Sequence, residues 1–355
     1  MKHLRRYLWK AVLLPSLAVL GVLLALDVLF SYISELESLT GDYQALQALQ
    51  FVMTTVPRRA YEFLPLAVLL GTLLGLGMLA SNSELVVIRS AGVSTLRISW
   101  MVLRPAIVLL AIGMALGEYV VPHAERMAQT NRALAESGEQ VVRSREGYWH
   151  REGNTFIHIN AVEAGGVLHG ITHYHFDENR ALVDTRFAPR AIYQSGEGHW
   201  VMENVRGSAL EQDRVRRYAA GFDVWETELT PEMLAIVVLD PDRLALQSLW
   251  EYSTWLERQG VEAGEYLLAF WQKLFMPLGT LGMVLIAISF VFGPLRQVSM
   301  GLRLTTGIMA GMLFHYGQRF AGHMSLVLDF SPFIAAMAPV LFCTVLGLWL
   351  LVRVR

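Results

Sequence analysis

Six long apolar runs limit what this chain can fold into. They cover about residues 11–33, 63–80, 98–121, 266–292, 304–320 and 332–352. Each is close to the ~20 residues that a helix needs to cross ~30 Å of hydrocarbon. They also explain why 17% of the residues are charged, against about 25% in an average soluble domain. The first run is too long for a signal peptide. The pattern predicts a membrane protein with six transmembrane helices.

Lys and Arg in the short loops predict the orientation of these helices, because such residues concentrate on the cytoplasmic side. With both termini inside, nearly all bases of the termini and short loops fall on that side; they are Lys2, Arg5, Arg6, Lys10, Arg89, Arg97, Arg104, Arg296, Arg303, Arg353 and Arg355. Arg58 and Arg59 are the exceptions. We therefore expect both termini in the cytoplasm and residues 122–264 outside.

The outer segment has a different pattern from the apolar runs. Short alternating stretches near 150–159, 170–176, 190–194 and 200–205 are separated by turn residues, which is typical of an antiparallel sandwich or roll. Helical patterning over 123–139 predicts an outward stalk on the third span. Residues 242–259 mix Leu and Trp with charge and predict an amphipathic helix at the interface.

The chain carries no motif for catalysis. GxxxxGK[ST], HExxH, GxSxG and CxxC are all absent from the sequence, so we expect no ATP hydrolysis, no cofactor and no metal in this chain. His169, His173 and His175 suggest a metal site, but exposed strand positions are the favoured interpretation because no supporting ligand has suitable spacing. The net charge of −2 gives no reason to expect nucleic acid as a partner.

Two features inside the spans have both functional and structural interpretations. Five ionisable residues, Asp27, Glu62, Glu118, His315 and Arg319, fall in or near them, and the sequence leaves a functional role as open as a structural one. Three GxxxG pairs begin at Gly71, Gly113 and Gly307. Because such pairs permit close helix contact, we favour packing within the bundle for them.

The predicted cytoplasmic segment 83–92 forms a short helix by its pattern. Residues at 81–83 can cap its start, Glu84 lies in the first turn, and Gly92 can end it. A short helix with apolar residues and one acid suits docking to a soluble partner. It equally suits an interfacial turn on the headgroups, and spacing alone leaves both open.

Four stretches carry a resemblance to a known family. Residues 69–87 are similar to the second span and coupling helix of the lipopolysaccharide export permeases, and residues 292–308 to their loop between spans four and five. Residues 117–133 fit the third span and stalk, and 239–242 fit the end of the periplasmic domain. The resemblance covers nearly the whole chain and is closer to the G-type permease subunit than to its F-type partner.

The resemblance implies an ABC transporter in the inner membrane of a Gram-negative envelope, with this chain as a non-catalytic subunit. An F-type permease and a homodimeric cytoplasmic ATPase, which binds the ATP and Mg, complete the transporter. It extracts lipopolysaccharide from the outer leaflet and passes it to a single-span periplasmic jellyroll protein of the bridge. The implied coupling helix contacts the ATPase through Glu84, Leu85, Val87, Ile88 and Arg89. The implied domains are 1–139, a β-jellyroll-like domain at 140–245, and 246–355.

The chain departs from the family near the outer end of span one. Relatives carry lysines there that suit lipid A phosphates, whereas this chain has Asp27, Glu35 and Glu37. Anion recognition is then expected from Arg58, Arg59, Arg132 or Arg319, or from the partner permease. Spans one, two and five are expected to line a cavity for acyl chains, with walls at Phe63, Leu66, Leu304, Ile308, Met312 and Tyr316.

Two other function classes fit parts of the pattern. A mechanotransmission subunit would use ATPase work to move its periplasmic domain without carrying lipid, but that class generally has fewer spans and a larger insert. An ATPase-independent secondary transporter or sensor would be expected to show paired charges near the membrane midplane. The sequence does not show that pairing clearly.

Overall fold

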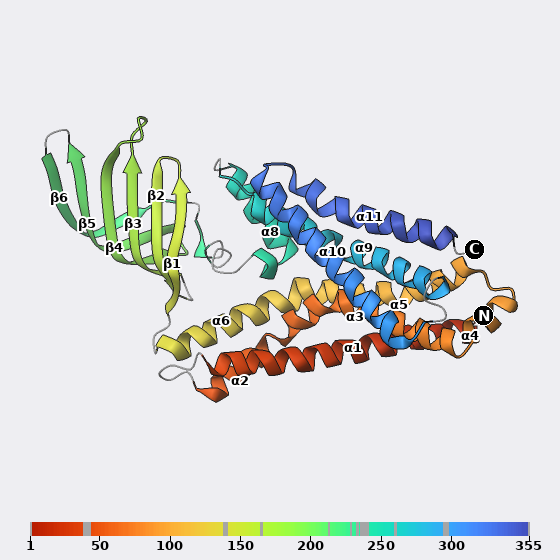
Figure 1. Cartoon of the computed structure of the whole chain (residues 1–355). Coiled ribbons are helices and arrows are strands. Elements are labelled where there is room, and N and C mark those ends of the chain that lie inside the picture. The colour runs from red at the N-terminus through yellow and green to blue at the C-terminus, as the bar shows by residue number, and fades with distance from the viewer. Residues whose placement is uncertain are drawn as a thin grey trace.

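Long helices and one antiparallel sheet make up the chain in a computed structural model, with the sheet beyond one end of the helical bundle (Figure 1). The structure describes residues 2–37, 44–137, 141–163, 166–211, 214–227, 229–231, 234, 241–258, 261–293 and 298–353. Both termini and the short helix α4 lie at the bundle end opposite the sheet (Figure 1). The helices are α1 (Lys2–Leu36), α2 (Ala45–Thr54), α3 (Val56–Ser81), α4 (Glu84–Ser90), α5 (Thr95–Ala115), α6 (Val121–Ser137), α8 (Leu246–Arg258), α9 (Gly264–Phe292), α10 (Met300–Val327) and α11 (Pro332–Arg353).

Five of the described helical segments are long and apolar enough to cross a membrane. They are α1, α3, the continuous segment Thr95–Gln129, α9 and α11. The sixth predicted span corresponds to α10, which has 28 residues but carries His315, Arg319 and His323 along its length. A multi-pass membrane protein is confirmed, whereas the sixth crossing stays a prediction. α2 is an extra short helix that the apolar pattern did not indicate.

Glycines set the closest helix contacts in the bundle. Gly71 and Gly75 of α3 lie against the α1 backbone, so that a Cβ at Gly75 would meet the carbonyl oxygen of Ala11. On another side of α3, Gly307 and Gly311 of α10 lie against leucine side chains. Without side chains at these positions the helix axes approach closely, and the resulting van der Waals contacts stabilise helix association in lipid. The packing interpretation of the GxxxG pairs is confirmed for these two helix pairs.

Gly75→Val is expected to destabilise the bundle by about 1–3 kcal/mol, because the new side chain must push α1 away from α3. The measurement is the thermal unfolding midpoint of the purified chain in detergent. Gly21→Val is the matched control, since nothing in the described part of the chain lies within 4 Å of a Cβ built there. Equal midpoints for the two variants would contradict the close contact at Gly75.

The sheet has six strands in the order β1-β2-β3-β4-β5-β6, and every neighbouring pair is antiparallel. The strands are β1 (Val141–Glu152), β2 (Thr155–Glu163), β3 (Val167–Phe176), β4 (Leu182–Gln194), β5 (His199–Glu211) and β6 (Arg214–Trp225). The predicted antiparallel β domain is confirmed. Its described strands form a meander, however, whereas a jelly roll has two Greek keys with non-sequential neighbours. The jellyroll-like form is therefore not confirmed for these strands, and their order was not predicted, because strand composition does not specify which strands pair.

Two of the strands, β3 and β5, contain a local irregularity at which the buried face of the strand switches. In β3, Leu168 is buried before Gly170, whereas Ile171 and His173 are buried after it, so the buried face changes phase at the glycine. Gly170 has a positive φ of 64°. Asn204 of β5, with φ 54°, marks the same change of phase. Local irregularities of this kind bend strands and increase twist, and the sheet is accordingly curved (Figure 1).

α8 contributes to the apolar core of the β domain. Leu249 and Trp255 of α8 belong to one buried apolar cluster with Trp200 and Trp225 of the sheet. The ring of His150 on β1 stacks on Trp255 with centroids 5.1 Å apart. The helix predicted at the membrane interface over 242–259 therefore exists, and it also supplies part of the core of the β domain.

Burial lowers the pKa of His173, and also that of His150, to about 4. In the unfolded chain the two histidines become protonated below about pH 6.5, whereas in the folded chain they stay neutral until about pH 4. Stability is therefore lost as pH falls through this window, by about 3 kcal/mol for His173. Tryptophan fluorescence of the reconstituted chain between pH 7 and 4 measures the transition.

His173→Phe should reduce the acid sensitivity, because Nε2 of His173 is buried with no hydrogen-bond partner among the described residues, and an apolar ring removes its titration. His175→Phe on the exposed side of the same strand is the matched control. An unchanged acid transition in His173→Phe would show that protonation of this ring does not limit stability.

Candidate functional site

The short helix α4 sits at the bundle end that holds both termini (Figure 1). It runs from Glu84 to Ser90 between two residues with positive φ, Ser83 at 61° and Gly92 at 86°. These two residues turn the chain sharply at each end, so seven residues project as a separate helix between α3 and α5. The helix predicted over 83–92 is present, although Ser83 caps it without a side-chain hydrogen bond.

The predicted coupling residues divide between the two faces of α4. Leu85 is buried and Ile88 packs against the bundle core. Val87 is 65% exposed, and Arg89 is exposed with its guanidinium 6.0 Å from the Phe292 ring centroid. The Glu84 carboxylate accepts a hydrogen bond from the Tyr7 hydroxyl at 2.6 Å. Glu84 thus ties α4 to α1, and Val87 is the most exposed of the predicted apolar contacts.

Sequence reasoning missed two contributors at this end. Val86 is 42% exposed beside Val87, so the outward face of α4 has two adjacent valines. Arg303 at the start of α10 is buried and donates a hydrogen bond to the Gly77 carbonyl oxygen of α3 at 2.6 Å. Only tertiary structure shows that α1 and α10 are both anchored by polar bonds near α4.

An open apolar face spans α1, α3 and α10. α1 and α10 each pack against α3 through glycine contacts on different sides of that helix. Of the predicted walls, Ile308, Met312 and Tyr316 of α10 are 40%, 49% and 60% exposed, whereas Phe63, Leu66 and Leu304 are half-buried. Between residues 14 and 33 of α1 the exposed large apolar residues are Leu14, Leu17, Val22, Leu26, Leu29, Phe30 and Ile33. The structure therefore brings the predicted spans together, and the α10 residues are the most open of the predicted walls.

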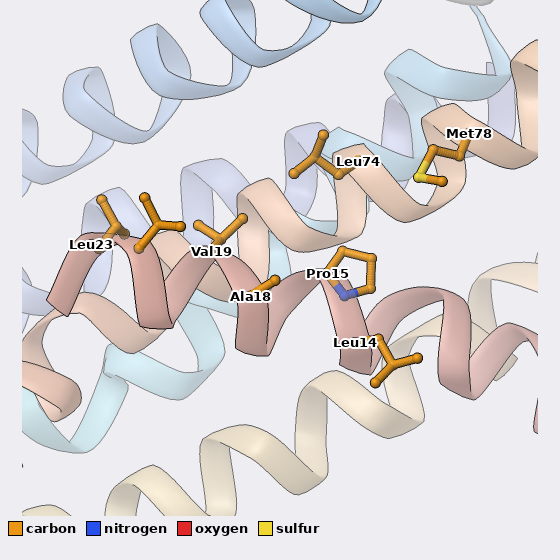
Figure 2. Close-up of a pocket in the computed structure, with 8 residues that line it drawn as sticks. Leu14, Pro15, Ala18, Val19, Leu23, Leu74 and Met78 are labelled. Atoms are coloured by element: carbon orange, nitrogen blue, oxygen red, sulfur yellow. The ribbon is translucent and has the colours of Figure 1, made fainter. Parts of the chain in front are cut away.

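A groove of about 550 Å³ lies on this face. Its lining is entirely apolar and comes from α1 and α3: Leu14, Pro15, Ala18, Val19, Val22, Leu23, Leu74 and Met78. In Figure 2, Leu74 and Met78 of α3 lie beside Pro15 and Val19 of α1. None of these residues was a predicted wall, because an apolar span gives no signal for which of its faces stays open.

Three of the four predicted anion-binding arginines are paired with acids. Arg58 pairs with Glu62 at 2.7 Å and with Glu125 at 3.2 Å. The other two pairs explain the unusual acids of span one; they are Arg59 with Asp27, and Arg132 with Glu35 at 3.1 Å. Arg319 of α10 is exposed and forms no ion pair within the described part of the chain. It is the candidate cation that stays open to a ligand in this conformation.

A polar junction joins the bundle to the β domain; we define it as Glu118, Glu125, Arg58, Arg243 and Lys273. The Glu125 side chain is 1% exposed and lies 2.8 Å from Arg243, which lies three residues before the start of α8. Glu118, in the π-helical turn Leu116–Val120, accepts the backbone N–H groups of the first turn of α8 at 2.7 and 3.3 Å. Lys273 of α9 donates to the Gly117 and Leu244 carbonyl oxygens at 3.1 and 2.7 Å.

The junction and the arginine pairs assign structural contacts to the acids in and near the spans. Asp27 forms an ion pair with Arg59, Glu62 forms one with Arg58, and Glu118 accepts a backbone hydrogen bond at the start of α8. His315 lies against the Tyr316 ring at 5.7 Å on the open face. In the β domain, no group of three potential ligands that could hold a metal ion occurs among the residues described; His173 packs edge-on against Trp225 instead.

Comparison with known proteins gives matches over nearly the full length of the chain. The family model described as lipopolysaccharide export system permease LptF/LptG matches residues 6–353. The chain is 37% identical over 352 residues to the lipopolysaccharide export system permease protein LptG of Escherichia coli K12, covering 99% of this chain and 98% of that protein. It is 35% identical over 353 residues to the LptG protein of Haemophilus influenzae, covering 99% of each.

Proposed function

Because the chain belongs to the lipopolysaccharide export system permease LptF/LptG family, we propose that it is the G-type permease subunit of an ABC transporter. This transporter extracts lipopolysaccharide from the outer leaflet of the inner membrane and passes it to a periplasmic bridge. The observation that supports this most is the similarity over nearly the whole chain, which takes in both helical halves and the inserted sheet.

The proposed topology has six spans, with both termini and α4 in the cytoplasm and the sheet in the periplasm. α10 is the sixth span in this arrangement. The shared end of the two termini and α4, opposite the sheet, supports it (Figure 1). So do the bases at that end, among them Lys2, Arg5, Arg6 and Lys10. The domain division at 139/140 and 245/246 falls after α6, which ends at Ser137, and immediately before α8, which begins at Leu246.

The proposed partners follow from the two ends and the open face. A homodimeric ATPase, which carries the ATP and Mg, contacts α4 from the cytoplasm. The F-type permease faces α1 and α10 across a cavity that holds the acyl chains, and the single-span periplasmic jellyroll protein contacts the β domain. This chain then contributes positioning and force transmission rather than a chemical step.

The anchors around α4 support a route for force. The Glu84–Tyr7 hydrogen bond joins α4 to α1, and the Arg303–Gly77 hydrogen bond joins α10 to the α4 end of α3. α1 and α10 are the two outer walls of the open apolar face. Movement of α4 by a closing ATPase would therefore shift both walls and narrow the cavity. The polar junction would carry the same movement to α8 and the sheet.

In this proposal Arg319 pairs with a phosphate of the lipid headgroup, since its guanidinium is exposed beside Tyr316 and Phe320. A photocrosslinker placed at Met312 should give lipopolysaccharide adducts, and Arg319→Gln should reduce their yield about fivefold or more, as expected for loss of about 1 kcal/mol or more. A crosslinker at Val345 of α11, which is 62% exposed, is the matched control.

Affinity purification of the tagged chain tests the assembly directly. We expect the ATPase and a second permease in the eluate. Recovery of this chain alone, or equal adduct yields at Met312 and Val345, would contradict the proposed function.

A further inference from the structure

We propose that the groove between α1 and α3 binds one acyl chain of an anionic phospholipid from the cytoplasmic leaflet, with Lys10 contacting its phosphate. This lipid is a resident ligand and differs in depth from the transported one. The inference rests on the orientation given under the proposed function. It does not require that the chain transports lipopolysaccharide.

The depth of the groove indicates which leaflet supplies the lipid. Its α1 wall runs from Leu14 to Leu23, which at 1.5 Å per residue is about 13 Å along the helix. One leaflet of the hydrocarbon core is about 15 Å thick, half of ~30 Å. The α3 wall ends at Met78, three residues before the end of α3 and close to α4. The groove therefore covers the half of the bundle on the α4 side.

The outer half of the same face lies beyond the groove. On α1 it carries exposed Leu26, Phe30 and Ile33, and on α10 exposed Tyr316 and Phe320. A lipid extracted from the outer leaflet reaches these residues first. Two lipids of opposite leaflets can thus occupy one face at different depths.

Charge at the mouth of the groove selects the headgroup. Lys10 is exposed and lies four residues before Leu14, so it continues the i, i+4 stripe formed by Leu14, Ala18 and Val22. No ion pair involves Lys10 within the described ranges. Arg6 is exposed one turn earlier on the same side. A base near the membrane surface attracts anionic lipid by about 1 kcal/mol.

Shape supplies the rest of the selectivity. Burial in lipid gives no hydrophobic gain over the surrounding acyl chains, so an apolar groove retains a chain by fit. Pro15 and Ala18 on the α1 wall have small side chains and so leave space in the groove. Leu74 and Met78 line the opposite wall (Figure 2). A bulky residue at Ala18 would fill that space without touching the core, because Ala18 is exposed.

The experiment measures lipid retained by the purified full chain in nanodiscs made of equal phosphatidylglycerol and phosphatidylcholine, released by mild detergent and counted by native mass spectrometry. We expect a retained phosphatidylglycerol on the wild-type chain. Lys10→Gln should lower its retention relative to phosphatidylcholine about fivefold, the factor that corresponds to about 1 kcal/mol. Ala18→Trp should remove retention of both lipids.

Val345→Trp on the exposed side of α11 is the matched control and should retain phosphatidylglycerol like the wild type. Equal retention in Lys10→Gln and wild type would overturn the headgroup contact. Equal retention in Ala18→Trp and wild type would overturn the groove. Two other results would assign the groove to a different occupant and overturn the proposal. One is co-purified lipopolysaccharide retained in place of phosphatidylglycerol. The other is a photocrosslinker at Ala18 of the assembled transporter that reacts with a partner helix but with no lipid. Since none of these readouts needs transport, failure of the proposed function leaves the outcome interpretable.

Discussion

Val87→Asp is expected to abolish lipid export while leaving the chain folded. Val87 is 65% exposed on α4, so the substitution removes no internal contact. If α4 docks into an apolar groove of the ATPase, the new carboxylate must be buried without a partner, which costs several kcal/mol. A loss of about 3 kcal/mol is more than a hundredfold in affinity. The measurements are the amount of ATPase that co-purifies with the chain and the release of lipopolysaccharide from proteoliposomes.

Val215→Asp makes the same change at the other end of the molecule and is the matched control, because Val215 of β6 is 62% exposed. It should co-purify with normal amounts of ATPase. Tyr7→Phe then separates docking from anchoring, since it removes only the hydrogen bond to Glu84. Normal assembly with Val87→Asp would refute docking through α4. Weakened export with intact assembly in Tyr7→Phe would assign Glu84 to the link with α1.

Glu125→Gln is expected to destabilise the chain by about 3–5 kcal/mol and to loosen the β domain from the bundle. The Glu125 side chain is 1% exposed and lies 3.2 Å from Arg58 and 2.8 Å from Arg243. Removing the carboxylate charge leaves two cations that are partly desolvated, and breaking a buried pair in this way has a cost of that size. Hydrogen exchange of α8, together with the thermal unfolding midpoint, measures the effect.

Glu62→Gln is a closely matched control, because Glu62 also pairs with Arg58 but is 48% exposed. An exposed pair is worth about 0–1 kcal/mol. A faster exchange of α8 in Glu125→Gln than in Glu62→Gln is therefore expected. Equal effects of the two substitutions would show that the polar junction does not hold α8.

Local pattern was enough to predict the five described segments that are long and apolar enough to cross a membrane, and the short helix α4. Apolar runs and loop charges report on each span separately, and Gly92 marks the end of α4 in the sequence as it does in the structure. The close contacts at Gly75 and Gly307 were also predictable, since GxxxG leaves few alternatives to helix packing. The ten-residue α2 was not predicted because it is too short to span a membrane.

Contacts between distant segments could not be predicted from one sequence. Asp27 and Arg59 are 32 residues apart, so pairing them requires knowledge of how α1 lies on α3. Glu118 caps a helix that begins 128 residues later. For the same reason the arginines proposed as free anion sites turned out to be paired, except Arg319. The order of the strands in the sheet could likewise not be predicted, because alternation fixes which residues share a strand face, not which strands are neighbours.

The meander order has a consequence for biogenesis. Every strand of the sheet pairs only with strands next to it in the chain, so the hydrogen-bonded ladders are complete once β6 has been synthesised. Local pairing of this kind forms early, and domains fold as they emerge during synthesis. The apolar core of the β domain, however, also includes Leu249 and Trp255, which come later in the chain. Between those two moments the core lacks the side chains of α8, so a nascent chain arrested before α8 would expose part of the apolar surface of the sheet to water.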